Sequence, residues 1–212
     1  MSATAASLET ALAAVESANR FVVQQVFKPI ANEYRISAVP EGGEEGEPLL
    51  FVKQKKLKIK EDIRFRLAPD DGPHLFMIKS KSVFEFRGRH EVRDADDRPI
   101  GLLEKVFGRS LLRSHWRVRD AAGNELFEAH ESSWIVALLR RFADLGPDWF
   151  SLLAWVPFNF VVNRDGEPVG SYRRVLGKLR DRYVFELEPG LQDVDRRLVL
   201  AFAVALDALQ DR

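Results

Sequence analysis

LVLAFAVALDAL, residues 198–209, is apolar on every face of a helix and closes a chain that otherwise consists of short strand-like runs. A helix of this length spans roughly 18 Å, whereas a membrane crossing needs about 20 apolar residues. We therefore expect protein, not lipid, to surround it on all sides. Asp195 stands where an N-cap is expected, and Asp207 interrupts the run one turn before its end. The sequence predicts a buried helix at about 194–210.

Upstream of this helix, β-branched and aromatic runs alternate with turn residues from Phe21 onward. A weak repeat of strand, polar turn and strand occupies 91–105, 117–131 and 161–174. Its spacing is that of an antiparallel meander, not of βαβ units. We expect a mainly β fold in which an antiparallel barrel closes around the helix. The residues expected before the turns, and the glycines expected at positive φ, are Asp94, Asp120, Asn163, Gly123 and Gly166.

The length of 212 residues suits one all-β domain, which we place at 20–212. Residues 1–19 are rich in alanine and fit either a short helix or a frayed tail. They contain no basic residue and no continuous apolar core, so they do not indicate a secretory signal. There is no cysteine, which excludes disulfides and thiolate chemistry. We expect a cytoplasmic protein, soluble or peripheral at a membrane.

Thirty-two basic residues balance thirty-two acidic ones. Whole-molecule attraction to nucleic acid is therefore not expected, and binding to an anionic surface would need a local patch. The densest basic segment is 53–60, KQKKLKIK, in which the strand period places Lys56, Lys58 and Lys60 on one face. These lysines form either an anionic-headgroup patch or a solvated barrel exterior protected from edge pairing. Two further basic groups are Arg109, Arg113, Arg117 and Arg119, and Arg173, Arg174, Lys178, Arg180 and Arg182.

Three stretches make the chain recognisable: DRYVFELEPGLQDVDRRLVLAFAVALDALQ (181–210), GEPVGSYRR (166–174) and VRDADDRPIGLLEK (92–105). From about Phe21 to its end the chain resembles the LURP-one-related branch of the tubby C-terminal-like superfamily, whose relatives include the phospholipid scramblases. This resemblance implies a closed antiparallel β-barrel of twelve strands, threaded by a hydrophobic C-terminal helix. Such closure removes sheet edges, and the helix fills the lumen.

The resemblance also implies a function, a non-enzymatic tubby-like binding module. Tubby proteins bind phosphatidylinositol bisphosphate through a basic strand. In HLFMIKSKSVFEF, Lys79 and Lys81 occupy a loosely similar place. The expected ligand is an anionic phospholipid or phosphoinositide, with headgroup contacts from Lys56, Lys58, Lys60, Lys79 and Lys81.

An aromatic segment supports an alternative function. Periodicity does not settle whether 132–160 is helical or extended, but it contains Trp149, Phe150 and Trp155. These side chains fit core packing, or an apolar tip that contacts a membrane or a protein partner. The alternative is a soluble protein-interaction scaffold that uses 149–160.

Catalytic and metal motifs are not evident in the sequence. It has no nucleophile elbow, phosphate loop or dinucleotide fingerprint. The four histidines, His74, His90, His115 and His130, share no local ligand spacing, so no metal or cofactor is expected. Asp195 and Arg196 at the start of the apolar helix are explained by a cap and an ion pair with Arg180 or Arg182.

Overall fold

The fold is described from a computed structural model of the whole chain. It describes residues 3–27, 31–55, 62–69, 72–79, 88–106, 115–131, 159–175 and 182–208. Seven of the predicted contact residues lie outside these ranges: Lys56, Lys58, Lys60, Lys81, Trp149, Phe150 and Trp155.

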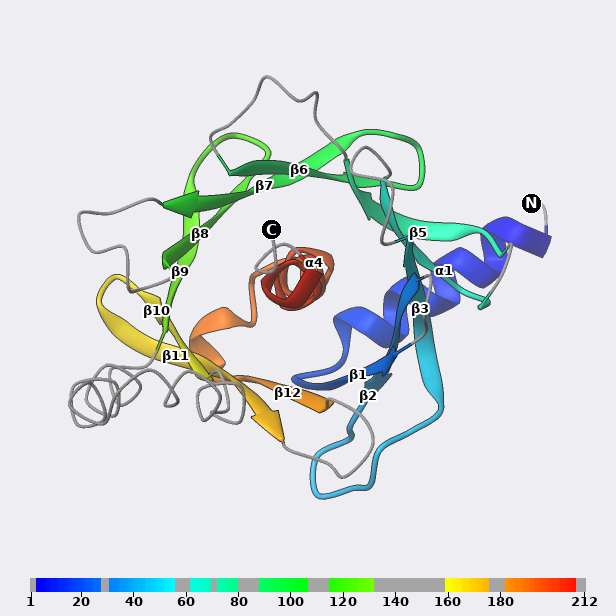
Figure 1. Cartoon of the computed structure of the whole chain (residues 1–212), viewed down its shortest axis with the longest axis horizontal. Coiled ribbons are helices and arrows are strands. Elements are labelled where there is room, and N and C mark those ends of the chain that lie inside the picture. Colours follow the sequence, from blue (N-terminus) through cyan, green and yellow to red (C-terminus); the bar gives the residue numbers. More distant parts are fainter. Residues whose placement is uncertain are drawn as a thin grey trace, which may run out of the picture.

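Twelve strands within the described ranges form one closed barrel, in the order β1-β12-β11-β10-β9-β8-β7-β6-β5-β4-β3-β2 (Figure 1). Every neighbouring pair is antiparallel, so the predicted fold class is confirmed. The strands are β1 (Arg20–Phe27), β2 (Ala31–Ala38), β3 (Pro48–Lys55), β4 (Ile63–Arg66), β5 (His74–Ile78), β6 (Arg89–Asp94), β7 (Pro99–Val106), β8 (His115–Asp120), β9 (Glu125–Glu131), β10 (Asn159–Arg164), β11 (Glu167–Val175) and β12 (Arg182–Leu187).

The apolar helix α4 (Arg196–Ala208) runs through the middle of this ring of strands (Figure 1). All nine residues from Leu198 to Leu206 are at most 2% exposed. Phe202 meets the rings of Trp116, Phe127 and Phe185 edge-on, with ring centroids 5.6–6.3 Å apart. The helix is apolar on every face because strands surround every face. No helix among the described residues is both long and apolar enough to cross a membrane.

Asp207, the one charge in the apolar run, is held by two tyrosines from the barrel wall. The hydroxyl of Tyr34 on β2 donates to Asp207 Oδ2, and that of Tyr183 on β12 donates to Oδ1, both at 2.6 Å. These hydrogen bonds compensate for the partial burial of the carboxylate. Asp207 therefore ties the last turn of α4 to the wall.

The first turn of α4 is fixed by a cap and by a buried guanidinium. Asp195 Oδ1 accepts from the backbone N–H of Arg197 at 2.9 Å, which confirms the predicted N-cap. Asp195 also pairs with the Arg197 side chain at 2.6 Å. The expected ion pair with Arg182 is wrong, because Arg182 pairs with Glu45 instead. Arg180, the other expected partner, lies outside the described residues.

Arg196 is 3% exposed and joins the start of α4 to the chain before β1. Its guanidinium donates to the carbonyl oxygens of Leu191, in the 3₁₀ turn η2 (Pro189–Leu191), and of Val194 and Ala18, and to Asn19 Oδ1. These acceptors explain why an arginine is tolerated at a buried position.

Residues at the start of the chain form helix α1 (Ala3–Glu16), which packs against α4, β3 and β5. Val15 is fully buried, and Leu8 and Leu12 pack against the core. Glu16 Oε1 accepts from the backbone N–H of Arg196 at 3.2 Å. Thus α1 meets the first turn of the central helix.

The hairpin turns of the sequence repeat confirm the predicted bonds of Asp94 and Asp120 and the positive φ of Gly123 and Gly166. Asp94 Oδ1 accepts from the backbone N–H of Asp96 and of Arg98, and Asp120 Oδ1 from that of Asn124. The turn between β10 and β11 has two consecutive positive φ angles. Positive φ occurs at Asp97 (62°), Gly123 (91°), Asp165 (54°) and Gly166 (86°).

Candidate functional site

The antiparallel order gives the barrel two ends with different connections. At one end α4 finishes, and β1–β2, β3–β4, β5–β6, β7–β8, β9–β10 and β11–β12 are joined. We call this the basic end. At the other, which we call the acidic end, α4 begins and the remaining strands are joined.

The two ends are named for the charged residues in the sequences that connect the strands there. Those of the basic end lie largely outside the described residues. They contain Lys28, Lys56, Lys58, Lys60, Lys79, Lys81, Arg87, Arg109, Arg113, Arg140, Arg141, Lys178 and Arg180, against Glu61, Asp62, Glu85, Asp144, Asp148 and Asp181. Those of the acidic end have the opposite excess, from Glu41, Glu44, Glu45, Glu47, Asp70, Asp71, Asp96, Asp97, Asp165, Glu188, Asp193 and Asp195. In the sequence, the connections at one end are therefore richer in lysine and arginine and those at the other end are richer in carboxylates. Two described ion pairs link residues of the two ends, Glu45 with Arg182 and Asp97 with Lys79.

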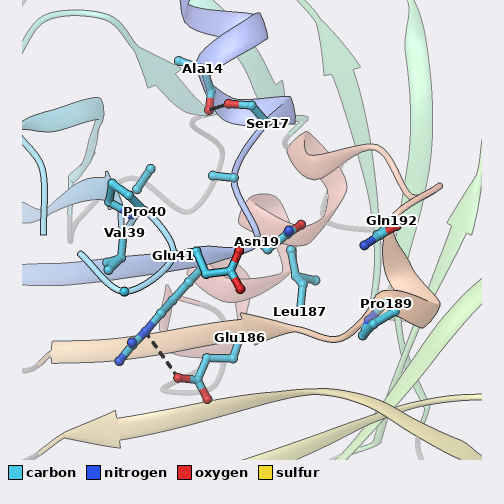
Figure 2. A pocket seen from close by; sticks show the side chains of 14 residues that line it. Ala14, Ser17, Asn19, Val39, Pro40, Glu41, Glu186, Leu187, Pro189 and Gln192 are labelled. Atoms are coloured by element: carbon cyan, nitrogen blue, oxygen red, sulfur yellow. Dashed lines mark hydrogen bonds and ion pairs between the residues drawn. The ribbon is translucent and has the colours of Figure 1, made fainter. Parts of the chain in front are cut away.

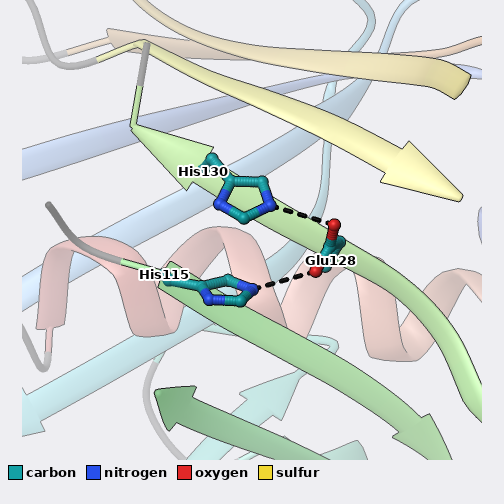
Figure 3. A group of neighbouring side chains, drawn as sticks. All are labelled: His115, Glu128 and His130. Atoms are coloured by element: carbon teal, nitrogen blue, oxygen red, sulfur yellow. Dashed lines mark hydrogen bonds and ion pairs between the residues drawn. The ribbon is translucent and has the colours of Figure 1, made fainter. Parts of the chain in front are cut away.

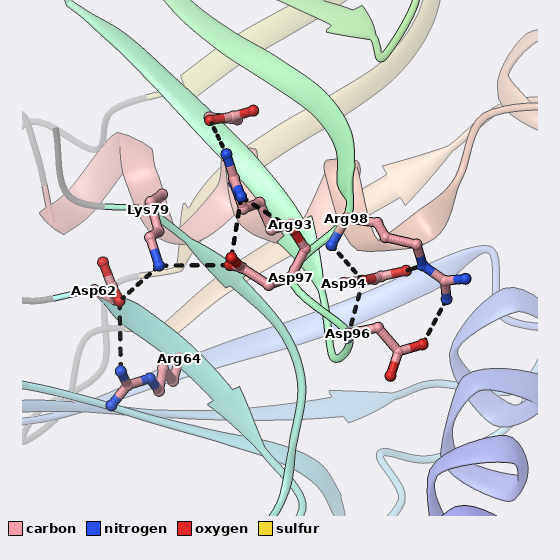
Figure 4. Close-up of polar contacts among 9 residues, drawn as sticks. Asp62, Arg64, Lys79, Arg93, Asp94, Asp96, Asp97 and Arg98 are labelled. Carbon is pink, nitrogen blue, oxygen red and sulfur yellow. Dashed lines mark hydrogen bonds and ion pairs between the residues drawn. The ribbon is translucent and has the colours of Figure 1, made fainter.

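Lys79 is the one predicted lysine that the structure describes. Its ammonium lies 3.4 Å from Asp97 Oδ1 and 3.6 Å from Asp62 Oδ2 (Figure 4). Both carboxylates have further cations, Arg93 for Asp97 and Arg64 for Asp62. Lys79 therefore belongs to a mixed-charge network on β4, β5 and the β6–β7 turn, and a headgroup would have to displace two carboxylates to reach it.

Described arginines of the other predicted basic groups also pair with carboxylates. Arg119 pairs with Glu104 and Glu125, and Arg117 lies 3.6 Å from Glu125. Arg173 on β11 pairs with Glu186. The barrel wall thus carries alternating charge, and its described arginines do not form a continuous basic surface.

A pocket of about 730 Å³ opens at the acidic end (Figure 2). The end of α1, the chain after β2 and the end of β12 line it, with Asn19, Glu41 and Gln192 among the lining residues. Arg20 and Glu186 form an ion pair within it, at 3.2 Å. Lys79, the predicted contact residue that the structure describes, does not line this pocket.

Sequence reasoning missed one cluster, formed by His115, Glu128 and His130 on the outer face of β8 and β9 (Figure 3). The Nε2 atoms of His115 and His130 each lie 3.0 Å from a different oxygen of Glu128. The two imidazoles stack with centroids 4.1 Å apart. The signal that could have found the cluster is the pairing of β8 with β9, which places His115 opposite His130.

Burial and the neighbouring His130 lower the pKa of His115, although Glu128 acts in the opposite direction. The pKa of Glu128 is lowered, chiefly by its hydrogen bond to His130. The cluster is therefore suited to a neutral imidazole at His115 beside a carboxylate.

The fold places the chain in the class of closed barrels built around a hydrophobic helix. The LURP-one-related family model matches residues 49–207, and the chain belongs to the LURP-one-related family. A solved structure of an Arabidopsis thaliana protein is similar at 12% identity and a TM-score of 0.35, covering 95% of this chain and 98% of that one. The comparison with curated proteins finds no match.

Proposed function

We propose that this chain is a non-enzymatic binding module that attaches peripherally, in the cytoplasm, to anionic phospholipid headgroups through its basic end. The observation that carries the proposal is the strand order, because it gathers at one barrel end the strand termini that lead into the lysine- and arginine-rich connections. Membership of the LURP-one-related family, with its tubby-like relatives, is consistent with a binding role.

Lys56, Lys58, Lys60 and Lys81 are the proposed headgroup contacts. The first three follow β3 directly, and Lys81 follows β5 by three residues. Each basic residue near an anionic surface contributes about 1 kcal/mol, so four would give a salt-dependent attachment and not a permanent one. Lys79 should contribute less, since Asp62 and Asp97 already neutralise it.

The charge separation also orients the protein. The acidic end is repelled by an anionic membrane, whereas the basic end is attracted. α1 meets the start of α4 at the acidic end, so it would face away from the lipid.

Vesicle cosedimentation with neutral, phosphatidylserine and phosphoinositide lipids at low and near-physiological salt tests the proposal. We expect binding to anionic vesicles alone, weakening as salt rises. Lys58→Glu and Lys81→Glu should each reduce it several-fold. Arg35→Glu makes the same charge change on the exposed wall of β2 and is the matched control. Equal losses in all three variants would contradict a local basic site.

The alternative function, a protein-interaction scaffold that uses 149–160, is distinguished by the same measurement. The aromatic segment lies outside the described residues, between the ends of β9 and β10. The scaffold hypothesis is favoured if no vesicle binds the protein and Trp149→Ala abolishes copurification of a partner.

A further inference from the structure

The two histidines and the glutamate on β8 and β9 face the same side of the barrel wall. His115 lies directly opposite His130 in the strand pairing, and Glu128 precedes His130 by one strand repeat. Trp116, which follows His115, and Ala129, which lies between Glu128 and His130, are fully buried in the core. The cluster therefore points outward, and its three side chains are 21–41% exposed.

The donor atoms are nearly close enough to share one metal ion. One ligand atom from each residue lies within 4.8 Å of the other two, and Glu128 is 3.0 Å from both imidazole nitrogens. Four ligands at the 2.0–2.2 Å typical of zinc stand roughly 3.4 Å apart in a tetrahedron. Small side-chain rotations would bring these three atoms to that spacing without moving either strand.

Two imidazoles with one carboxylate form a ligand set characteristic of zinc sites with an open position. Each histidine would ligate the metal through Nε2 and keep its remaining proton on Nδ1. The Glu128 carboxylate would coordinate the metal and lose its present hydrogen bonds to the two imidazoles. Arg117 is a competitor of the metal for Glu128, because the two residues lie opposite each other in the β8–β9 register. Its guanidinium interacts with Glu125, at 3.6 Å, which leaves the carboxylate of Glu128 directed at the histidines.

We propose that His115, Glu128 and His130 form a binding site for a divalent transition-metal ion, with Zn²⁺ the best fit. The fourth tetrahedral position faces solvent and would hold water or a ligand from a partner. Bound metal would join β8 to β9 beside the end of β9, from which the chain leaves for the aromatic segment. This inference does not depend on lipid binding.

Calorimetric titration of the tag-free, chelator-treated full chain with Zn²⁺ tests the site. We expect one ion per chain and, in a parallel titration with Co²⁺, the visible absorption of a four-coordinate complex. His130→Ala and Glu128→Gln should each weaken binding at least tenfold, since even second-shell changes cost roughly 10–100-fold. His90→Gln and Glu186→Gln alter the same residue types outside the cluster, Glu186 being on β12, and should leave binding unchanged.

A second measurement uses the unmodified protein, so that it does not depend on the folding of a variant. The imidazole ¹⁵N resonances of His115 and His130 should shift together on adding Zn²⁺, while those of His74 and His90 should not. Absence of saturable Zn²⁺ binding, or equal shifts at all four histidines, would overturn the proposal.

Discussion

Asp207 shows how a single residue fixes the end of the central helix. Tyr34 and Tyr183 are 1% and 5% exposed, and both hydroxyls donate to its carboxylate. A buried donor that loses its partner costs about 1–3 kcal/mol. We therefore expect Asp207→Leu to lower the free energy of unfolding, measured in urea, by about 2–4 kcal/mol.

Asp207→Asn keeps one carbonyl acceptor and should cost less than Asp207→Leu. Asp96→Leu, at a turn carboxylate that is 72% exposed, is the control for loss of charge. A stable Asp207→Leu protein would show that the two hydroxyls have other adequate partners.

Glu16 makes the junction of α1 and α4 sensitive to pH. Partial desolvation and the negative charge of Asp195 raise its pKa from 4.5 to about 6. The folded protein thus binds this proton more tightly than the unfolded chain. The stabilisation that protonated Glu16 provides is complete below about pH 4.5 and is lost as the pH rises through about 6.

The comparison that tests this linkage is wild type against Glu16→Gln, whose amide oxygen can still accept from Arg196. As the pH rises from 4.5 to about 6, the free energy of unfolding of the wild-type protein should fall relative to that of the variant. The difference should be at most about 1 kcal/mol, because Glu16 is partly exposed and solvent screens its interactions. Parallel stability curves across this range would contradict the assignment.

Residue-level prediction from sequence succeeded where partners are local. The Asp195 cap and the turn bonds of Asp94 and Asp120 involve neighbours within four residues. The partners of Asp207 could not be predicted, since Tyr34 is 173 positions away. Only the closed barrel brings them together.

At the scale of elements, the contact between α4 and β7 depends on a glycine. A Cβ at Gly101 would stand 2.4 Å from the carbonyl oxygen of Arg119 and 2.7 Å from Leu198 Cδ2. The β8 backbone and the Leu198 side chain would both have to shift. We expect Gly101→Ala to lower the midpoint of thermal unfolding, with a loss of about 1–3 kcal/mol typical of overpacking.

Gly46→Ala is the matched control for that substitution. A Cβ there would approach only the Ala38 carbonyl oxygen, at 3.4 Å, and the backbone has no positive φ. Its midpoint should stay near that of wild type. Equal effects of the two substitutions would argue against close packing of α4 on β7.

The elements themselves were largely predictable, but their neighbours across the barrel were not. The hydrophobicity of 198–209 predicted a surrounded helix, and the turn residues predicted antiparallel hairpins. The histidine cluster was missed because ligand spacing was sought along the chain. His115 and His130 meet only through the β8–β9 register.

At the scale of the whole molecule, strand order converts a neutral composition into a barrel with two different ends. Because the connections alternate between the ends, the strand termini that lead into the lysine- and arginine-rich connections lie at one end, and those that lead into the carboxylate-rich connections lie at the other. Sequence analysis identified the basic segments but could not place them, since that required the topology. We propose that the basic end faces an anionic membrane.

Site-specific labelling tests this claim most directly, because a chain with no cysteine accepts single reporters. Val175→Cys, at the last residue of β11, marks the basic end at a position that is 47% exposed. Ala122→Cys, in the exposed β8–β9 turn, marks the acidic end. Each variant carries an environment-sensitive fluorophore and is titrated with anionic vesicles. We predict shielding from an aqueous quencher at Val175→Cys alone, reversed by high salt; shielding at Ala122→Cys alone, or equal shielding at both ends, would contradict the account.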